Sequence, residues 1–201
     1  MAREAPTAIL EATLRVIAKS GVDAVRYRDV AHEAGVPLGT VSYHFSARAG
    51  LIRAAFKFFL EQNTATLLAL RARLPAEGFD EVAEFLTEVV RADFADRRRR
   101  YLAEYELVVY AARDPAIAEA LAAWNWARLA EFAPVLERLG VPRPNAAART
   151  LVDIVRGFEL YNLGSKQPDL DDLRRRLRDV LRTLAPSKKK GTTDAPRQKA
   201  R

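Results

Sequence analysis

The fold of the N-terminal part of this chain is decided by residues 28–45, RDVAHEAGVPLGTVSYHF. The stretch begins as an amphipathic helix, breaks at Gly35-Val36-Pro37 and resumes as a segment of only seven residues, 38–44. Gly35 can adopt the left-handed backbone of a tight turn without steric cost, and Pro37 suits a helix start because it has no N–H to satisfy. Two short helices joined in this way form a helix-turn-helix, which the spacing therefore predicts.

Small and apolar side chains stand where the two short helices would meet. Ala31 lies at the expected crossing point, and Val41 is placed to pack back under the first of them. Val30, Val36 and Phe45 would complete a small core with the preceding helix. With Val41 and Phe45 turned inward, the other side chains of the second short helix must face outward or sideways.

Those outward side chains have the chemistry of a DNA contact. Thr40, Tyr43 and His44 can donate hydrogen bonds to phosphate oxygens, and phosphate contacts fix the register of a protein on the duplex. Leu38 presents methyl groups that can meet a thymine methyl in the major groove. Arginines near the starts of the second and fourth predicted helices are placed to bind flanking phosphates. We predict DNA contacts at Arg28, Pro37, Leu38, Gly39, Thr40, Ser42, Tyr43, His44 and Arg48.

The rest of the chain is also helical by pattern. Asp114-Pro115 opens a helix, Gly140-Val141-Pro142 separates two others, and no segment shows sustained strand alternation. This pattern predicts an all-α fold, with an N-terminal three-helix helix-turn-helix domain and a C-terminal helical bundle. The expected parts are a DNA-binding domain at 1–47, an effector-binding and dimerisation domain at 48–185, and a tail at 186–201. The predicted helices span 6–20, 28–34, 38–44, 48–73, 79–94, 97–112, 115–139, 145–163 and 169–184.

The net charge of +7 comes largely from the tail, PSKKKGTTDAPRQKAR. The tail holds six basic residues and one acidic residue, so the rest of the chain holds 27 basic and 25 acidic residues and is nearly neutral. A segment so poor in apolar residues is expected to be disordered. It can add nonspecific contact with phosphates, or it can simply raise solubility.

Composition argues against an enzyme, a metal protein and a membrane protein. His32 and His44 are the only histidines, both fall in the predicted helix-turn-helix, and there is no cysteine. There is also no Gly-rich phosphate loop and no His-Glu-x-x-His motif, so we expect no catalytic residue, no metal site and no cofactor. No apolar run reaches the roughly 18 residues that a membrane span needs, and the N-terminus lacks a signal pattern. We expect a cytoplasmic protein.

Residues 9–56 resemble the DNA-binding domain of the TetR family of transcriptional regulators. The resemblance rests on a first helix followed by Gly21, on the motif RDVAHEAGV, and on GTVSYHF followed by a basic residue and a leucine. It implies an all-α homodimer with an N-terminal DNA-reading domain and a divergent C-terminal effector-binding domain. It also assigns operator contacts to Arg28, Gly39, Thr40, Tyr43, His44 and Arg48.

The chain departs from the family pattern at four places near the turn. Arg26 stands where Ser or Thr often caps the second helix, and Pro37 replaces the usual Ser cap of the recognition helix. Leu38 stands where Lys is common, and Ser42 where Tyr is common. We therefore expect the base preference to differ from that of related regulators.

The last two predicted helices carry apolar faces whose residues alternate in steps of three and four, as in a helix bundle. The resemblance favours a four-helix bundle built from two subunits, and packing within one chain is the alternative. A two-fold dimer would present its recognition helices about 34–36 Å apart on a pseudo-palindromic operator. The candidate interface residues are Leu151, Ile154, Val155, Phe158, Leu170, Leu173, Leu177, Val180 and Leu184.

Aromatic side chains of the middle helices are candidates for an effector pocket, although aromatic residues at helical spacing most often pack in a core. Trp124 and Trp126 lie about 200° apart around a helix, so they cannot both face one pocket. The candidate pocket residues are Phe94, Arg98, Tyr101, Tyr105, Trp124, Phe132, Phe158 and Tyr161.

Four consecutive arginines at 97–100 cannot all face solvent within one helix, because they sweep about 300° of its surface. Either a helix begins there with Asp96 as its cap, or one arginine points inward. An inward arginine would pair with Glu104, Glu106 or an anionic ligand.

The expected mechanism is allosteric repression. A small molecule in each C-terminal domain would shift the helix at 48–73 and release double-stranded operator DNA, with a coupling of typically about 1–3 kcal/mol. Two alternatives are a ligand-dependent activator and a helical protein-interaction module that does not bind DNA. Salt-dependent binding to duplex DNA separates the interaction module from a regulator.

Overall fold

The protein is described by a computed structural model that covers residues 4–72, 78–95 and 98–184. Every regular element in those ranges is helical, which confirms the predicted all-α fold, and each predicted helix end lies within two residues of the observed one. The short η1 turn is the one element among them that was not predicted. The helices are α1 (Ala5–Ser20), η1 (Val22–Ala24), α2 (Tyr27–Ala34), α3 (Leu38–His44), α4 (Arg48–Arg71), α5 (Phe79–Ala95), α6 (Arg98–Ala111), α7 (Pro115–Arg138), α8 (Pro144–Tyr161) and α9 (Leu170–Leu184).

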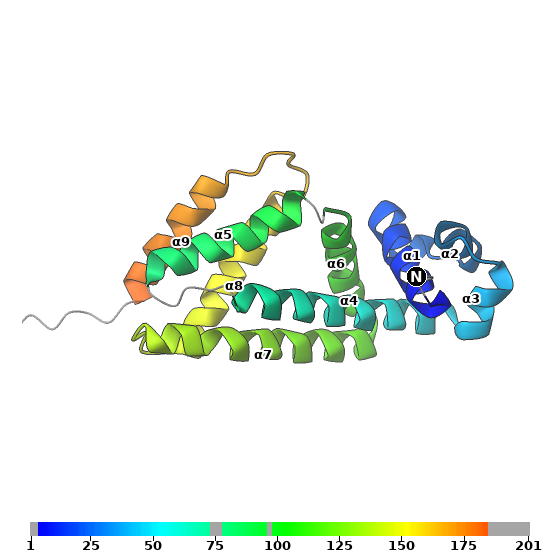
Figure 1. The fold of residues 1–201 in the computed structure, drawn as a ribbon, viewed down its shortest axis with the longest axis horizontal. Helices are drawn as coiled ribbons and strands as arrows, with labels where there is room; N and C mark the ends of the chain where they lie inside the picture. Colours follow the sequence, from blue (N-terminus) through cyan, green and yellow to red (C-terminus); the bar gives the residue numbers. More distant parts are fainter. Residues whose placement is uncertain (1–3, 73–77, 96–97, 185–201) are drawn as a thin grey trace, which may run out of the picture.

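The molecule is elongated, with a head made of α1, η1, α2 and α3 at one end (Figure 1). Helix α4 runs from the head into the body formed by α5–α9, and α7 packs alongside it. Helix α6 stands between the two parts and packs along α1. The head is therefore joined to the body by two helices, α4 and α6.

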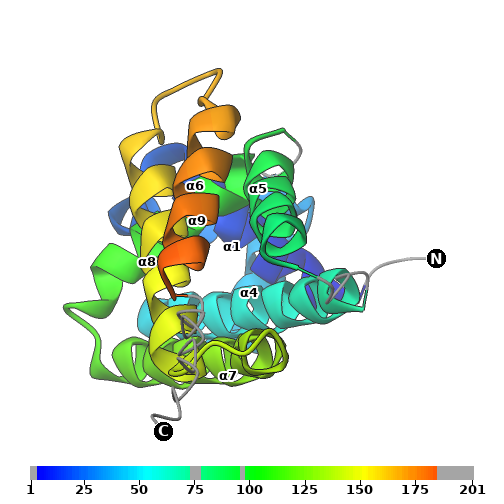
Figure 2. The same cartoon turned by 90° about the vertical axis from the view of Figure 1, so that its left-hand side faces the viewer.

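The far end of the body is built from α5, α8 and α9 (Figure 2). Helix α9 packs mainly on α5, and α8 packs mainly on α7. Within the described ranges, no helix is long and apolar enough to cross a membrane.

Two clusters of buried apolar side chains hold these elements together. The first runs from the head through α4 into α6 and α7, and it includes Val41, Phe56 and Leu107. The second joins α5, the C-terminal half of α7, α8 and α9. Because the first cluster continues from α3 into α4, no break in the packing marks residue 47, and the predicted domain boundary stays a prediction.

The apolar faces of α8 and α9 pack largely inside the chain, and the expected dimer interface stays a prediction. The α9 leucines meet α5 of the same chain, because α5 offers an apolar face of its own. The predicted interface residues divide into buried and partly buried side chains. Those buried are Leu151, Val155, Phe158, Leu173 and Leu177, and those partly buried against the same cluster are Ile154, Leu170, Val180 and Leu184.

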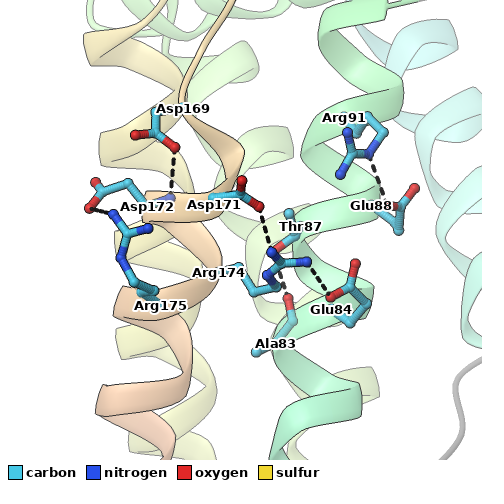
Figure 3. Close-up of polar contacts among 10 residues, drawn as sticks. All are labelled: Ala83, Glu84, Thr87, Glu88, Arg91, Asp169, Asp171, Asp172, Arg174 and Arg175. Carbon is cyan, nitrogen blue, oxygen red and sulfur yellow. Dashed lines mark hydrogen bonds and ion pairs between the residues drawn. The ribbon is translucent and has the colours of Figure 1, made fainter.

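Ion pairs along the rim of this packing fix α9 on α5 (Figure 3). Arg174 of α9 lies between Glu84 of α5, 3.2 Å from its Nη1, and Asp171 one turn earlier in α9. Arg178 forms a second bridge to Asp80 of α5, with 3.2 Å between Nε and Oδ1. These pairs set the register of the two helices, although pairs this exposed each add little stability.

Candidate functional site

The turn between α2 and α3 has the geometry that its sequence predicts. Gly35 adopts φ 68° and ψ 31°, the left-handed conformation that glycine reaches without steric cost. The N–H of Val36 then donates to the carbonyl of Ala31 at 3.0 Å, which closes the end of α2. Ala31 is buried where the helices cross. The small residue and the glycine together allow α3 to leave α2 at a sharp angle.

Helix α3 is held in place by side chains that point into the core of the head. Val41 is fully buried, and Phe45 packs half-buried against the same cluster. The Tyr27 hydroxyl, at the start of α2, donates to the Phe45 carbonyl at 2.5 Å, just beyond the end of α3. With these contacts fixed, the opposite face of α3 is presented to solvent in one orientation.

The exposed face of α3 collects most of the predicted DNA contacts. Tyr43 is 84% exposed and its ring meets His44 edge-on, with 5.1 Å between the ring centroids. Leu38 is 52% exposed on the same helix. Pro37, Gly39 and Ser42 are also exposed and Thr40 is partly so. The structure thus brings these residues together, and their contact with DNA stays a prediction.

The two predicted phosphate-binding arginines differ in their surroundings. The Arg28 side chain is 82% exposed. Arg48 instead donates from Nε to the Val25 carbonyl at 2.8 Å and from Nη2 to the Val22 carbonyl at 2.7 Å. It therefore ties the start of α4 to η1, in addition to any contact with phosphate. The unpredicted η1 turn supplies the Val22 carbonyl and the residue just after it supplies the Val25 carbonyl, which is why the sequence did not reveal this role.

Helix α4, which leads out of the head, is held to the body at the point where α6 ends and α7 begins. Asp114 caps α7 by accepting from the N–H groups of Ala116 at 3.1 Å and Ile117 at 3.3 Å, as its sequence predicts. Its carboxylate also accepts from Arg53 of α4 at 3.0 Å. Burial acts to raise the pKa of Asp114, but the hydrogen bond from Arg53 and those from the backbone outweigh it and lower that pKa.

Several predicted effector-pocket residues are buried or packed in the apolar clusters, and their place in an effector pocket stays a prediction. Tyr101, Trp124 and Phe158 are buried, and Phe94 and Phe132 pack against the second apolar cluster. Tyr161 is 91% exposed, so it closes no cavity within the chain. Helix α6 is described from Arg98 onward, and the predicted cap Asp96 lies outside the described residues, so both interpretations of the four arginines stay predictions. The side chain of Arg98 lies outside the described part of the chain.

A cavity of about 390 Å³ does lie between α6, α7 and α8. Tyr105 is the one predicted pocket residue in its wall. Trp126, which is 65% exposed, also lines it, whereas Trp124 is buried and donates from Nε1 to the hydroxyl of Thr64 at 3.1 Å. The two tryptophans therefore face different surroundings, as predicted, but Trp126 rather than Trp124 faces this cavity.

A buried polar cluster stands behind the wall of this cavity, and the sequence did not predict it. Arg156 of α8 pairs with Glu104 of α6, and its Nη1 lies 3.1 Å from Oε2 of Glu159. The Tyr105 hydroxyl donates to the same Glu159 oxygen at 3.1 Å. Burial acts to lower the pKa of Arg156, but Glu104 and Glu159 raise it, so the guanidinium stays charged.

Tyrosines extend this polar cluster toward α5. Burial and the charge of Glu159 raise the pKa of both Tyr101 and Tyr105, so both phenols stay protonated at neutral pH. The rings of Phe94, Tyr101 and Tyr105 form a row, with centroids 5.3 Å and 5.0 Å apart. No group of acidic or histidine side chains suited to a metal ion occurs in the described ranges.

The two halves of the chain match two descriptions of one family. Residues 9–55 match "Bacterial regulatory proteins, tetR family", and residues 77–187 match "Tetracyclin repressor-like, C-terminal domain". The second match alone covers more than half of the chain. The two matches fall on the head with the start of α4, and on α5–α9.

Known relatives agree with these matches. The chain is 32% identical over 120 residues to the HTH-type transcriptional regulator CymR of Pseudomonas putida, which covers 60% of this chain and 57% of CymR. The chain spans about half the length of the curated relatives that it matches, from 40% to 57%.

Solved structures match over a larger share. A TetR family member from Streptomyces coelicolor A3 has a TM-score of 0.68 at 30% identity, over 92% of this chain and 99% of that one. The multidrug binding protein EbrR complexed with imidazole has a TM-score of 0.67 at 30% identity, over 92% and 97%. EbrR complexed with proflavin has 0.61 at 29% identity, over 88% and 99%. The chain therefore belongs to the TetR family, whose members are DNA-binding transcriptional regulators.

Proposed function

We propose that this chain is a homodimeric repressor whose α3 enters the major groove of a pseudo-palindromic operator. The observation that carries the proposal is the division of α3 into two faces. Val41 and the Tyr27–Phe45 contact fix the inner face, while Tyr43 and Leu38 project from the outer face. A helix fixed in this way can present its side chains to base edges and phosphates without first becoming ordered.

The outward side of α8 is our candidate for the contact between two copies. Leu160 and Tyr161 are exposed there by 59% and 91%, and Gly157 leaves the backbone accessible between them and the preceding turn. Large exposed apolar side chains that adjoin one another mark an interaction surface more often than scattered ones do. A two-fold axis beside α8 would pair each of these residues with its counterpart and place the two heads on one face of the DNA.

The third part of the proposal is release of the operator DNA by a small molecule. It includes the division of the chain into a DNA-binding domain up to residue 47 and an effector-binding domain after it. EbrR is described as a multidrug binding protein and is known in complexes with imidazole and proflavin, so a protein of this fold can hold small molecules. In this chain the cavity between α6, α7 and α8 adjoins the helix that packs along α1. A ligand that shifts α6 would therefore change the position of the head.

The test begins with duplexes selected from random DNA by the full-length protein. Gel-shift affinity for the selected duplex should fall by about 5- to 150-fold in Thr40→Ala and in Tyr43→Ala, because each loses a contact worth about 1–3 kcal/mol. Trp126→Ala is the matched control, because it removes an exposed aromatic ring from the body instead of the head. Unchanged affinity in both α3 variants, with folding verified by circular dichroism, would contradict the assignment.

A further inference from the structure

We infer that the cavity between α6, α7 and α8 binds a small molecule with a flat apolar body and one anionic group. The inference rests on the proposed function, because it names the class of ligand that would act at the cavity invoked there. The volume of about 390 Å³ suits a ligand of drug-like size. Its walls combine apolar side chains with a small number of polar groups, which is the usual composition of such sites.

The charges of the cavity wall favour an anion. Arg128, Arg149 and Arg156 line it, against the single carboxylate of Asp153. Arg149 and Asp153 are four residues apart in α8, yet they form no ion pair with each other or with any other residue in the described part of the chain. Among the residues that the structure describes, none neutralises the charge of Arg149.

The deepest arginine of the wall is already oriented. Arg156 holds Glu104 and Glu159 through Nη2 and Nη1, which together occupy two of the five N–H groups of a guanidinium. Its Cζ also lies 5.9 Å from the ring centroids of both Tyr105 and Trp124. A guanidinium held in this way can offer a remaining N–H edge to a carboxylate or sulfonate at little cost in side-chain entropy.

The aromatic part of the wall suits the apolar body of the ligand. Trp126 exposes 65% of its surface and lines the same cavity as Leu121 and Leu129. Arg128 lies over the neighbouring Trp124, with Cζ 4.4 Å from the ring centroid. This contact holds the Arg128 side chain in place on that side of the cavity. A flat ring against Trp126 would bury surface that the chain otherwise leaves in water.

An anion at this place would act on the link between α6 and α8. Arg156 already carries two carboxylates, so a third anion beside it weakens the attraction that each of them feels. Glu104 belongs to α6, which packs along α1, whereas Glu159 belongs to α8 together with Arg156. Ligand binding would therefore weaken the contact that joins α6 to α8 as well as the contact within α8, and the first of these bears on the position of α6.

The test uses two probes that share one ring system and differ in charge. 1-Anilinonaphthalene-8-sulfonate carries the anion, and N-phenyl-1-naphthylamine is its neutral counterpart. Fluorescence titration of the full-length protein should show one sulfonate site per chain with a dissociation constant at least about tenfold below that of the neutral probe. Proflavin, a cation with a flat ring system, should bind more weakly than the sulfonate.

Single-residue variants test the sign of the charge effect. Arg149→Gln should weaken sulfonate binding about threefold and Asp153→Asn should tighten it, because each change alters one exposed charge at the cavity. Trp126→Ala should weaken both naphthalene probes. Arg175→Gln removes an exposed arginine on α9, away from the cavity, and should change nothing. These variants leave the buried Glu104–Arg156 pair intact, so their folding is not at risk.

Three results would overturn the inference. They are equal binding of the neutral and anionic probes, tighter binding of proflavin than of the sulfonate, and shifts in Arg149→Gln and Asp153→Asn that are absent or reversed. Gel shifts with the same samples separate this failure from failure of the proposed function. If the protein binds its selected duplex but gives one of these results, only the inferred ligand class is wrong.

Discussion

Arg53 of α4 donates from Nε to Asp114 at 3.0 Å, and Asp114 is the residue that caps α7. One carboxylate therefore closes the start of a long body helix and also holds the helix that leaves the head. The side chain of Asp114 is 5% exposed while that of Arg53 is half exposed, so the two partners lose different amounts of hydration when they pair. Removing the aspartate affects two elements, and removing the arginine affects one contact.

Asp114→Ala should lower the free energy of unfolding by about 2 kcal/mol, because the cap of α7 and the ion pair are lost together. Asp114→Asn is the matched control, since asparagine is also a good cap but carries no charge. It should cost less than the alanine variant. Urea denaturation followed by circular dichroism measures both values, and equal losses in the two variants would show that the cap contributes nothing.

The same carboxylate should make stability depend on pH in the acid range. The pKa of Asp114 is lower in the folded chain, so its contribution is fully present above the unfolded pKa of about 3.9 and is lost as pH falls through the folded pKa. We expect the wild-type chain to lose more stability below about pH 4 than Asp114→Asn does. Urea midpoints at pH 3 and pH 6 measure the difference, and parallel curves for the two proteins would contradict it.

Arg48 and Arg28 should give opposite results on substitution. Arg48→Gln removes hydrogen bonds to the carbonyls of Val22 and Val25 and should lower the free energy of unfolding by about 1–2 kcal/mol. Arg28→Gln should leave stability unchanged, because its side chain is exposed, and should reduce the slope of log affinity against log salt by about one. Thermal unfolding and salt-dependent gel shifts measure these effects. A stable Arg48→Gln protein would show that the carbonyl contacts are incidental.

The helix boundaries could be predicted because they depend on residues at the boundary itself. Gly35 ends α2 through its left-handed backbone, and Asp114 opens α7 through its carboxylate. The exposed face of α3 could be predicted in the same way, because Val41 and Phe45 had to be turned toward the core. These constraints are local, so a short stretch of sequence is enough to predict them.

Contacts between distant helices could not be predicted, because nothing local specifies which faces meet. The leucine spacing of α9 indicated an apolar face, but it did not show that α5 of the same chain packs on that face. An inward arginine from 97–100 was expected to pair with Glu104, Glu106 or an anionic ligand, and those arginine side chains lie outside the described part of the chain. The pair between Glu104 of α6 and Arg156 of α8, 52 residues apart, was not predicted.

The two sides of α8 and α9 should separate stability from self-association. Leu177→Ala empties a fully buried position and should cost about 2–5 kcal/mol of unfolding free energy. Tyr161→Ser changes a side chain that is almost entirely in water, so its cost in a single chain should be below about 0.5 kcal/mol. If α8 forms the dimer contact, Tyr161→Ser should raise the dimer dissociation constant in sedimentation equilibrium. An unchanged dissociation constant would place the contact elsewhere.

The buried Glu104–Arg156 pair should be more costly to break than to replace. Arg156→Met alone leaves Glu104 and Glu159 buried without their cation, so we expect a loss of about 3–5 kcal/mol. Replacing Glu104 by Leu as well removes one of the two stranded charges, and the double variant should recover part of that loss. Glu159 keeps the hydrogen bond from Tyr105, so recovery should be incomplete. Urea unfolding of both variants measures the difference, and a double variant less stable than Arg156→Met would show that Glu104 stabilises the chain without its arginine.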